Sequence, residues 1–175
     1  VVGDATGHGL NAGMMVSITK AGLVSTAVKS PAEITQSLNR VIKTIDLGTN
    51  RMSLNMTKIE NGTFEFTSAG MPPGYIYRSQ ESSVEEILVP GLPLGSMKLA
   101  EFDHQKFDMK PGDAFVLISD GLPECVNPKG DMLDYDSIKK CTQENGHKSA
   151  QGIIDSLIEL GNSWMSGLMN DDDIT

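Results

Sequence analysis

Acidic residues stand at three widely separated points of the sequence, each next to residues typical of a strand or a tight turn. Asp4 lies between an apolar pair and a glycine-rich turn, and Asp120 follows the apolar run AFVLI. Three adjacent acids occupy residues 171–173, directly before a β-branched pair. If the fold gathers these carboxylates, they form an oxygen-donor site suited to hard divalent cations such as Mg²⁺ or Mn²⁺. The composition and spacing of the sequence do not by themselves show that these carboxylates converge.

Each of these acids also has a purely structural explanation. Asp4 could cap a strand-to-helix turn, Asp-Gly at 120–121 is common in β-turns, and an acidic run is often an exposed loop. A zinc site is not indicated, because His8, His104 and His147 are scattered and the sequence contains no CxxC or HExxH motif. An acidic Ca²⁺ site near 131–136 lacks the spacing of an EF-hand.

Composition limits the class of protein. The chain has 175 residues, 39% hydrophobic and 21% charged, which predicts one globular domain and argues against disorder. A net charge of −9 without a Lys/Arg cluster argues against a nucleic-acid partner. No apolar run has the length of a membrane span, and two cysteines give no disulfide framework, which favours a reducing cytosol.

Helical periodicity predicts two helices in the first part of the chain. The first runs from Leu10 to about Val28, after a turn made by Gly7 and Gly9. Its predicted apolar stripe is Leu10, Met14, Ile18 and Ala21. The second begins at the capping-box sequence SPAE, with Ser30 as the cap. Its predicted stripe is Ile34, Leu38, Val41, Ile42 and Ile45.

Apolar and polar residues then alternate with a period of two. This alternation predicts a hairpin with strands around 52–56 and 64–66, joined by the turn ENG. Further predicted strands are GYIYR, VEEILV, FDHQKFDM and AFVLI, and two helices follow, the first at 135–144 and the second carrying Ile153, Leu157, Leu160 and Trp164. The order of predicted elements is helices, then strands joined by short turns, then helices. This order predicts an α+β fold with antiparallel sheets.

Five motifs, in this order and at these intervals, resemble the SpoIIE/RsbU-type PPM phosphatases, bacterial relatives of the PP2C serine/threonine phosphatases. They are GDATGHG, SAGMPP, GLPLGS, LISDGLPE and DDDIT, and together they span nearly the whole chain. The resemblance implies a PP2C-like antiparallel β-sandwich flanked by helices, in α-β-β-α layers, as a single domain over residues 1–175. A GGD motif in upstream strands is usual in the family and would lie before Val1, so we expect the fold to be incomplete at its N-terminal strands. Two positions depart from the family pattern: Met71 stands where many members have His, and Asp134 stands where Gly is common.

The resemblance also implies a site for two Mn²⁺ or Mg²⁺ ions. By the family pattern Asp4 bridges the ions, Ala5 offers its backbone carbonyl, and Asp120 and Asp172 complete the site, with Asp171 or Asp173 as alternatives to Asp172. No catalytic residue beyond these ligands is implied. Residues in supporting positions are Gly7, His8, Gly121 and Asp173.

The function implied is hydrolysis of phosphoserine or phosphothreonine in bacterial signalling, by a metal-activated water. The resemblance suggests as partners a phosphoprotein substrate, such as an anti-sigma-factor antagonist, and upstream sensor domains; a homodimer is an open alternative. The expected location is the cytoplasm, including the cytoplasmic part of a membrane-anchored sensor. The rival interpretation is a non-catalytic PPM-like module that binds partners or an ion.

Overall fold

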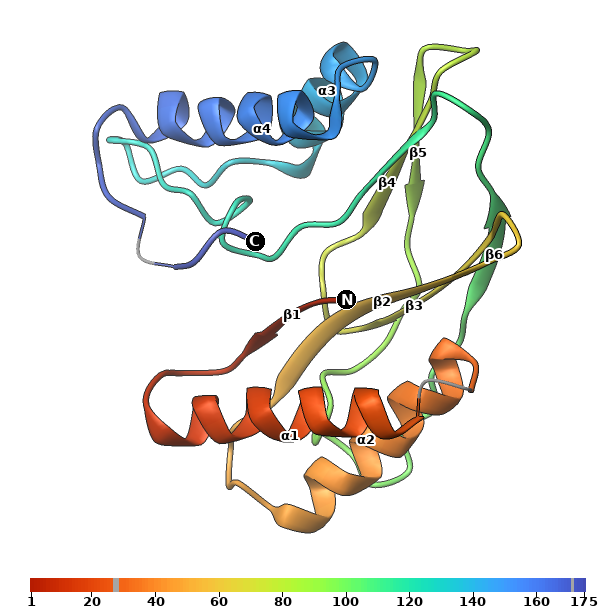
Figure 1. Ribbon diagram of the computed structural model, residues 1–175. Helices are drawn as coiled ribbons and strands as arrows, with labels where there is room; N and C mark the ends of the chain where they lie inside the picture. Colours follow the sequence, from red (N-terminus) through yellow and green to blue (C-terminus); the bar gives the residue numbers. More distant parts are fainter. Residues whose placement is uncertain (27–28, 171) are drawn as a thin grey trace. The chain divides into compact units, whose positions relative to one another are not determined.

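The computed structural model describes residues 1–26, 29–170 and 172–175 and divides into two compact units (Figure 1). Unit 1 comprises Val1–Met71 and Leu88–Asp108, and unit 2 comprises Pro72–Ile87 and Met109–Thr175. Both are built from helices and antiparallel strands, which confirms the predicted α+β class. A single domain over residues 1–175 stays a prediction. No helix in the described residues is long and apolar enough to cross a membrane.

Unit 1 is an antiparallel sheet with two helices packed on it (Figure 1). The strand order is β1-β2-β3-β6. Its elements are β1 (Val2–Ala5), α1 (Leu10–Thr26), α2 (Pro31–Ile45), β2 (Met52–Glu60), β3 (Thr63–Ala69) and β6 (Gln105–Asp108). The core joins both helices to the sheet and contains Met15, Ile34, Leu38, Ile42, Met52, Leu54 and Met56. This core fixes the end of β1, where the first candidate ligand lies.

The predicted hairpin is confirmed as β2 and β3. Asn61 and Gly62 both adopt positive φ, 52° and 83°, and join the paired residues Glu60 and Thr63. A two-residue turn with both φ positive matches the right-handed twist of the flanking strands, which explains the Asn-Gly sequence.

The predicted capping box at the start of α2 is confirmed. The Glu33 backbone N–H donates to Ser30 Oγ at 3.4 Å, and the Ser30 N–H donates to the Glu33 carboxylate at 3.0 Å. The predicted stripe is only partly right. Ile34, Leu38 and Ile42 are buried, whereas Val41 and Ile45 are each 44% exposed.

The predicted stripe on α1 is mostly wrong. Leu10, Met14 and Ala21 are exposed, and only Ile18 of the four packs against the core, where it is partly buried. Met15 and Thr19 are the buried residues of this helix. The sequence of α1 is apolar or small on almost every side, so its periodicity does not select one face. The observed helix ends at Thr26, and the predicted end at Val28 lies outside the described residues.

Unit 2 has a three-stranded sheet of order β5-β4-β7 with two helices packed on it. Figure 1 labels both helices and the strands β4 and β5. Its elements are β4 (Gly74–Arg78), β5 (Ser83–Ile87), β7 (Ala114–Val116), α3 (Tyr135–Asn145) and α4 (Ala150–Met165). The core contains Tyr75, Ile118, Leu122, Cys125, Leu133, Ile138, Ile153 and Leu157. Strands β5, β6 and β7 are shorter than predicted, because parts of the segments VEEILV, FDHQKFDM and AFVLI lie in irregular backbone.

An ion-pair network ties β4 to the turn before β7. The Asp113 side chain is 1% exposed and accepts hydrogen bonds from the backbone N–H groups of Ser79 (2.9 Å) and Lys110 (3.1 Å) and from the Arg78 guanidinium (3.0 Å). Burial alone would raise the pKa of Asp113, but these hydrogen bonds outweigh it and lower the pKa to about 2 from the ordinary 3.8. The network therefore stabilises the charged carboxylate.

We expect Asp113→Asn to lower the free energy of unfolding by about 2 kcal/mol at pH 7, at roughly 1.36 kcal/mol per pKa unit. Because the folded pKa is depressed, this stabilisation is present above about pH 4 and is lost as the pH falls through about 2. Urea unfolding of wild type and variant at pH 7 and near pH 2 measures the loss of stability and its dependence on pH. Glu85→Gln is the control, since Glu85 is half-exposed and its pair with Arg78 contributes about 1 kcal/mol or less. An equal effect of Asp113→Asn at both pH values would contradict the account.

Candidate metal centre

Asp4 lies within β1 at the third of its four residues, paired in register with Ser53 on β2. The chain then leaves the sheet through a turn in which Gly7 and Gly9 have φ of 81° and 79°, a region that a β-carbon disfavours. His8 stands between these glycines and is exposed. Unit 1 therefore presents a half-buried carboxylate beside a glycine turn that starts α1.

The register of β1 directs the Ala5 carbonyl away from β2. The Thr6 N–H donates to the Arg51 carbonyl at 2.9 Å, and in an antiparallel pair hydrogen-bonded positions alternate along the strand. The pair Ala5–Met52 is therefore a non-hydrogen-bonded one. Consistent with this, the Met52 N–H and carbonyl both bond to Leu94, at 3.2 and 2.8 Å. The Ala5 carbonyl therefore points away from β2 and is not used in the β1–β2 pairing.

Asp120 lies in a turn four residues after the end of β7, not directly at the strand end as the sequence predicted. The Glu124 N–H donates to the Asp120 backbone carbonyl at 2.9 Å, which closes the turn. The side-chain atom Asp120 Oδ1 is buried and accepts no hydrogen bond from any described residue. A buried carboxylate oxygen without a donor is costly in free energy unless another ligand, such as a cation, satisfies it.

The C-terminal acidic segment lies against this turn although about 50 residues separate them in sequence. The Ser119 N–H donates to the Thr175 carbonyl at 3.0 Å, and the Thr175 N–H donates to Ser119 Oγ at 3.0 Å. Asp172 and Asp173 are exposed, and Asp171 lies outside the described residues. Residues 174–175 form no strand, but their backbone already pairs with Ser119. Unit 2 thus places Asp120 and Asp172 on adjoining segments.

Gly121 allows this close approach. An added Cβ would overlap the carbonyl group of Asp173, so any side chain would push the two segments apart. The Asp-Gly pair at 120–121, which sequence reasoning could interpret as an ordinary turn, therefore has a packing role.

The surroundings of Asp120 are electrically negative. Burial first, and then the negative charges of Asp120 and Glu124, raise the pKa of the Tyr135 phenol. Such a field favours a cation over an anionic occupant.

The candidate ligands are divided between the two units. Asp4 and Ala5 belong to unit 1, and Asp120, Asp172 and Asp173 belong to unit 2. Among the described residues no three His, Cys, Asp or Glu side chains form a cluster that could hold a metal ion. Their convergence stays a prediction. Carboxylate and carbonyl oxygens, with the unsatisfied Asp120 Oδ1 among them, fit Mn²⁺ or Mg²⁺.

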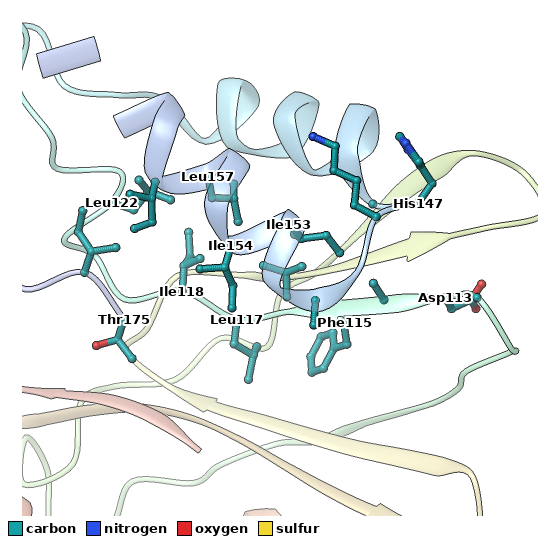
Figure 2. A pocket seen from close by; sticks show the side chains of 18 residues that line it. Asp113, Phe115, Leu117, Ile118, Leu122, His147, Ile153, Ile154, Leu157 and Thr175 are labelled. Atoms are coloured by element: carbon teal, nitrogen blue, oxygen red, sulfur yellow. The ribbon is translucent and has the colours of Figure 1, made fainter. Parts of the chain in front are cut away.

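A separate groove of about 760 Å³ lies within unit 2 (Figure 2). Ile153, Ile154 and Leu157 of α4 line one side, Leu117 and Ile118 line another, and Thr175 stands at one end. Asp120 and Asp172 do not line it, and its mostly apolar wall offers no set of metal ligands. We therefore distinguish it from the candidate metal centre.

The class of fold is that of the PP2C domains. The chain superimposes on the PP2C domain of SiaA from Pseudomonas aeruginosa with a TM-score of 0.82 over 98% of this chain and 70% of that one, at 16% sequence identity. The catalytic domain of the serine/threonine protein phosphatase PstP, solved with two manganese ions, gives a TM-score of 0.71 over 98% of this chain and 82% of that one, at 16% identity. At such identities the likeness shows the fold alone.

The family follows from the sequence. The family model described as stage II sporulation protein E (SpoIIE) matches residues 1–175, and the chain therefore belongs to the SpoIIE family. Phosphoserine phosphatase RsbU of Bacillus subtilis (strain 168) is 29% identical in an alignment that covers 91% of this chain and 50% of that protein. The chain spans about half the length of this curated relative.

The sequence did not indicate two residues of the centre. Ser119 and Asn170 connect the two acidic segments of unit 2 through hydrogen bonds (Ser119 Oγ to the Asp173 carbonyl, Asn170 Nδ2 to the Gly121 and Asp172 carbonyls). Both flank predicted ligands, but a serine before Asp-Gly and an asparagine before an acidic run carry no distinctive signal, since both residue types are common in turns.

Proposed function

We propose that this chain carries the catalytic centre of a metal-dependent protein phosphatase that hydrolyses phosphoserine or phosphothreonine in bacterial signalling. The observation that carries the proposal is the buried, unsatisfied Asp120 Oδ1 beside the segment of Asp172, in a member of the SpoIIE family. Two structural relatives in the same fold are phosphatase or PP2C domains, and one was solved with two manganese ions.

In this proposal Asp4, the Ala5 carbonyl, Asp120 and Asp172 hold two Mn²⁺ or Mg²⁺ ions. The bound ions would supply an activated water and neutralise the phosphoryl oxygens. The chain's own task is to hold its oxygens at fixed positions, which the β1–β2 register and the Asp120 turn do in their respective units. His8 and Asp173 have supporting places: His8 in the glycine turn, and Asp173 as an alternative to Asp172.

The substrate class follows from the curated relative, whose name is phosphoserine phosphatase. We propose a phosphoprotein substrate in a sigma-factor pathway, such as an anti-sigma-factor antagonist, in the cytoplasm. Upstream sensor domains would regulate the activity. Helix α1 is the proposed relay, because it begins five residues after Ala5 and packs on α2 through the close contact of Gly22 with Leu38.

The test is hydrolysis of a phosphoserine peptide by the full-length protein. We expect phosphate release in the presence of Mn²⁺, its loss after treatment with EDTA, and its return when Mn²⁺ is added back. A phosphoprotein from the organism's sigma-factor pathway serves as the second substrate. Metal binding without hydrolysis of either substrate would contradict the proposal and favour the non-catalytic PPM-like module.

A further inference from the structure

Asn170 joins the two acidic segments of unit 2 through one amide group. Its Nδ2 donates to the Gly121 carbonyl at 3.0 Å and to the Asp172 carbonyl at 2.6 Å. A side-chain amide nitrogen carries two hydrogens, so it can make both bonds at once. The Asn170 side chain therefore holds the turn that contains Asp120 at a fixed separation from the backbone of Asp172.

Ser119 makes the matching connection on the other side of Asp120. Only 3% of the residue is exposed, and its hydroxyl donates to the Asp173 carbonyl at 3.2 Å while accepting from the Thr175 N–H at 3.0 Å. With its own N–H bonded to the Thr175 carbonyl, Ser119 fixes residues 173–175 at three atoms. Asn170 and Ser119 thus hold the backbone of Asp172, Asp173 and Thr175 beside the turn that contains Asp120.

These bonds are made to backbone carbonyl and N–H groups and not to carboxylate oxygens. Asp120 Oδ1 accepts no hydrogen bond from the described residues, and Asp172 Oδ1 accepts one from the Asp173 N–H at 2.9 Å. Neutral donors that bond to the backbone can hold carboxylates close together without occupying the oxygens that a cation needs. They also oppose the mutual repulsion of the acids, which is strongest when no cation is bound.

We infer that Asn170 and Ser119 are positioning residues that preorganise Asp172 relative to Asp120 and thereby set the affinity of the metal centre. The inference rests on the proposed function for the identity of the site. Partners of metal ligands typically change metal affinity by about 10- to 100-fold when they are removed. Neither residue needs to touch a metal ion or a substrate for this effect.

The experiment measures Mn²⁺ binding to the full-length protein by calorimetry, with phosphate release as a second readout. We expect Asn170→Ala and Ser119→Ala each to weaken Mn²⁺ binding about tenfold. At saturating Mn²⁺ kcat should recover most of its wild-type value, because the ligands themselves remain. Ser119→Thr keeps the hydroxyl and should restore the affinity, whereas a purely structural defect would not follow this pattern.

Asn145→Ala is the matched control. Asn145 also donates its amide to a backbone carbonyl, that of Cys141 at 2.8 Å, but lies in α3 within the same unit. It should leave Mn²⁺ affinity unchanged, and thermal unfolding should show that all variants are folded. Equal Mn²⁺ affinity in wild type, Asn170→Ala and Ser119→Ala would overturn this inference alone. No Mn²⁺ binding by the wild type would overturn the proposed metal centre, and the inference with it.

Discussion

Replacing Asp120 by Asn is expected to lower Mn²⁺-dependent phosphate release by about 10³-fold while the chain stays folded. The substitution removes a ligand charge but almost no volume. A metal ion contributes several kcal/mol of transition-state stabilisation, and about 4 kcal/mol corresponds to a 10³-fold change in rate. Steady-state assays across a range of Mn²⁺ concentrations measure the loss. Full activity in the purified variant would eliminate Asp120 as a ligand.

The stability of the same variant without metal provides a second check. Burial first, and then the charges of Asp120 and Glu124, raise the pKa of Tyr135, so both acids contribute negative charge to the same surroundings. Neutralising Asp120 should therefore leave the free energy of unfolding unchanged or raise it. Asp155→Asn is the matched control, because Asp155 is an exposed acid on α4 that accepts a hydrogen bond from Gln151 Nε2 at 2.8 Å. We expect it to change neither activity nor metal affinity.

Gly121→Ala is expected to weaken Mn²⁺ binding by about 100-fold, the upper end of the effects seen when partners of metal ligands are changed. The added methyl group would occupy the space of the Asp173 carbonyl, so the acidic segment must move away from Asp120. Overpacking of this kind also costs roughly 1–3 kcal/mol of stability. Calorimetric Mn²⁺ titration and thermal unfolding measure the two effects.

Gly13→Ala is the control for this substitution. Gly13 lies in α1, where an added Cβ would meet no atom within 4 Å. Alanine there should raise stability by roughly 0.5–1 kcal/mol, because glycine is a poor helix former, and should leave Mn²⁺ affinity unchanged. Wild-type Mn²⁺ affinity in Gly121→Ala would mean that the position of the acidic segment does not matter for binding.

Local signals in the sequence predicted much of the fold. The capping box at Ser30, the Asn61–Gly62 turn and strand β4 each depend on residues adjacent in sequence, and each is confirmed. The buried face of α1 was wrong, because a helix that is apolar on most sides takes its orientation from tertiary packing. The predicted burial of Val41 and Ile45 was wrong for a related reason. The periodicity of α2 predicts a wider apolar stripe than the sheet covers.

The candidate site could be predicted only through the resemblance. Composition and spacing left Asp4, Asp120 and the acidic run as isolated features, each with a plain structural explanation. The structure adds a long-range fact within unit 2, the contact of the Asp120 turn with the segment of Asp172. Contacts such as those of Ser119 and Asn170 depend on how distant segments of the backbone meet, and no local pattern encodes that.

The division into two units has a consequence for how the chain folds and how it can be dissected. The chain passes from one unit to the other at 71–72, at 87–88 and at 108–109. Neither unit is therefore a contiguous stretch, and no single truncation point separates them. The native state of each unit requires a loop of the chain to close around the segment that belongs to the other, and closing such loops costs conformational entropy before the contacts form. Folding of the two units is thus coupled through the covalent chain itself. A fragment that ends at residue 71 lacks β6 of unit 1, and one that ends at residue 108 lacks β7 of unit 2.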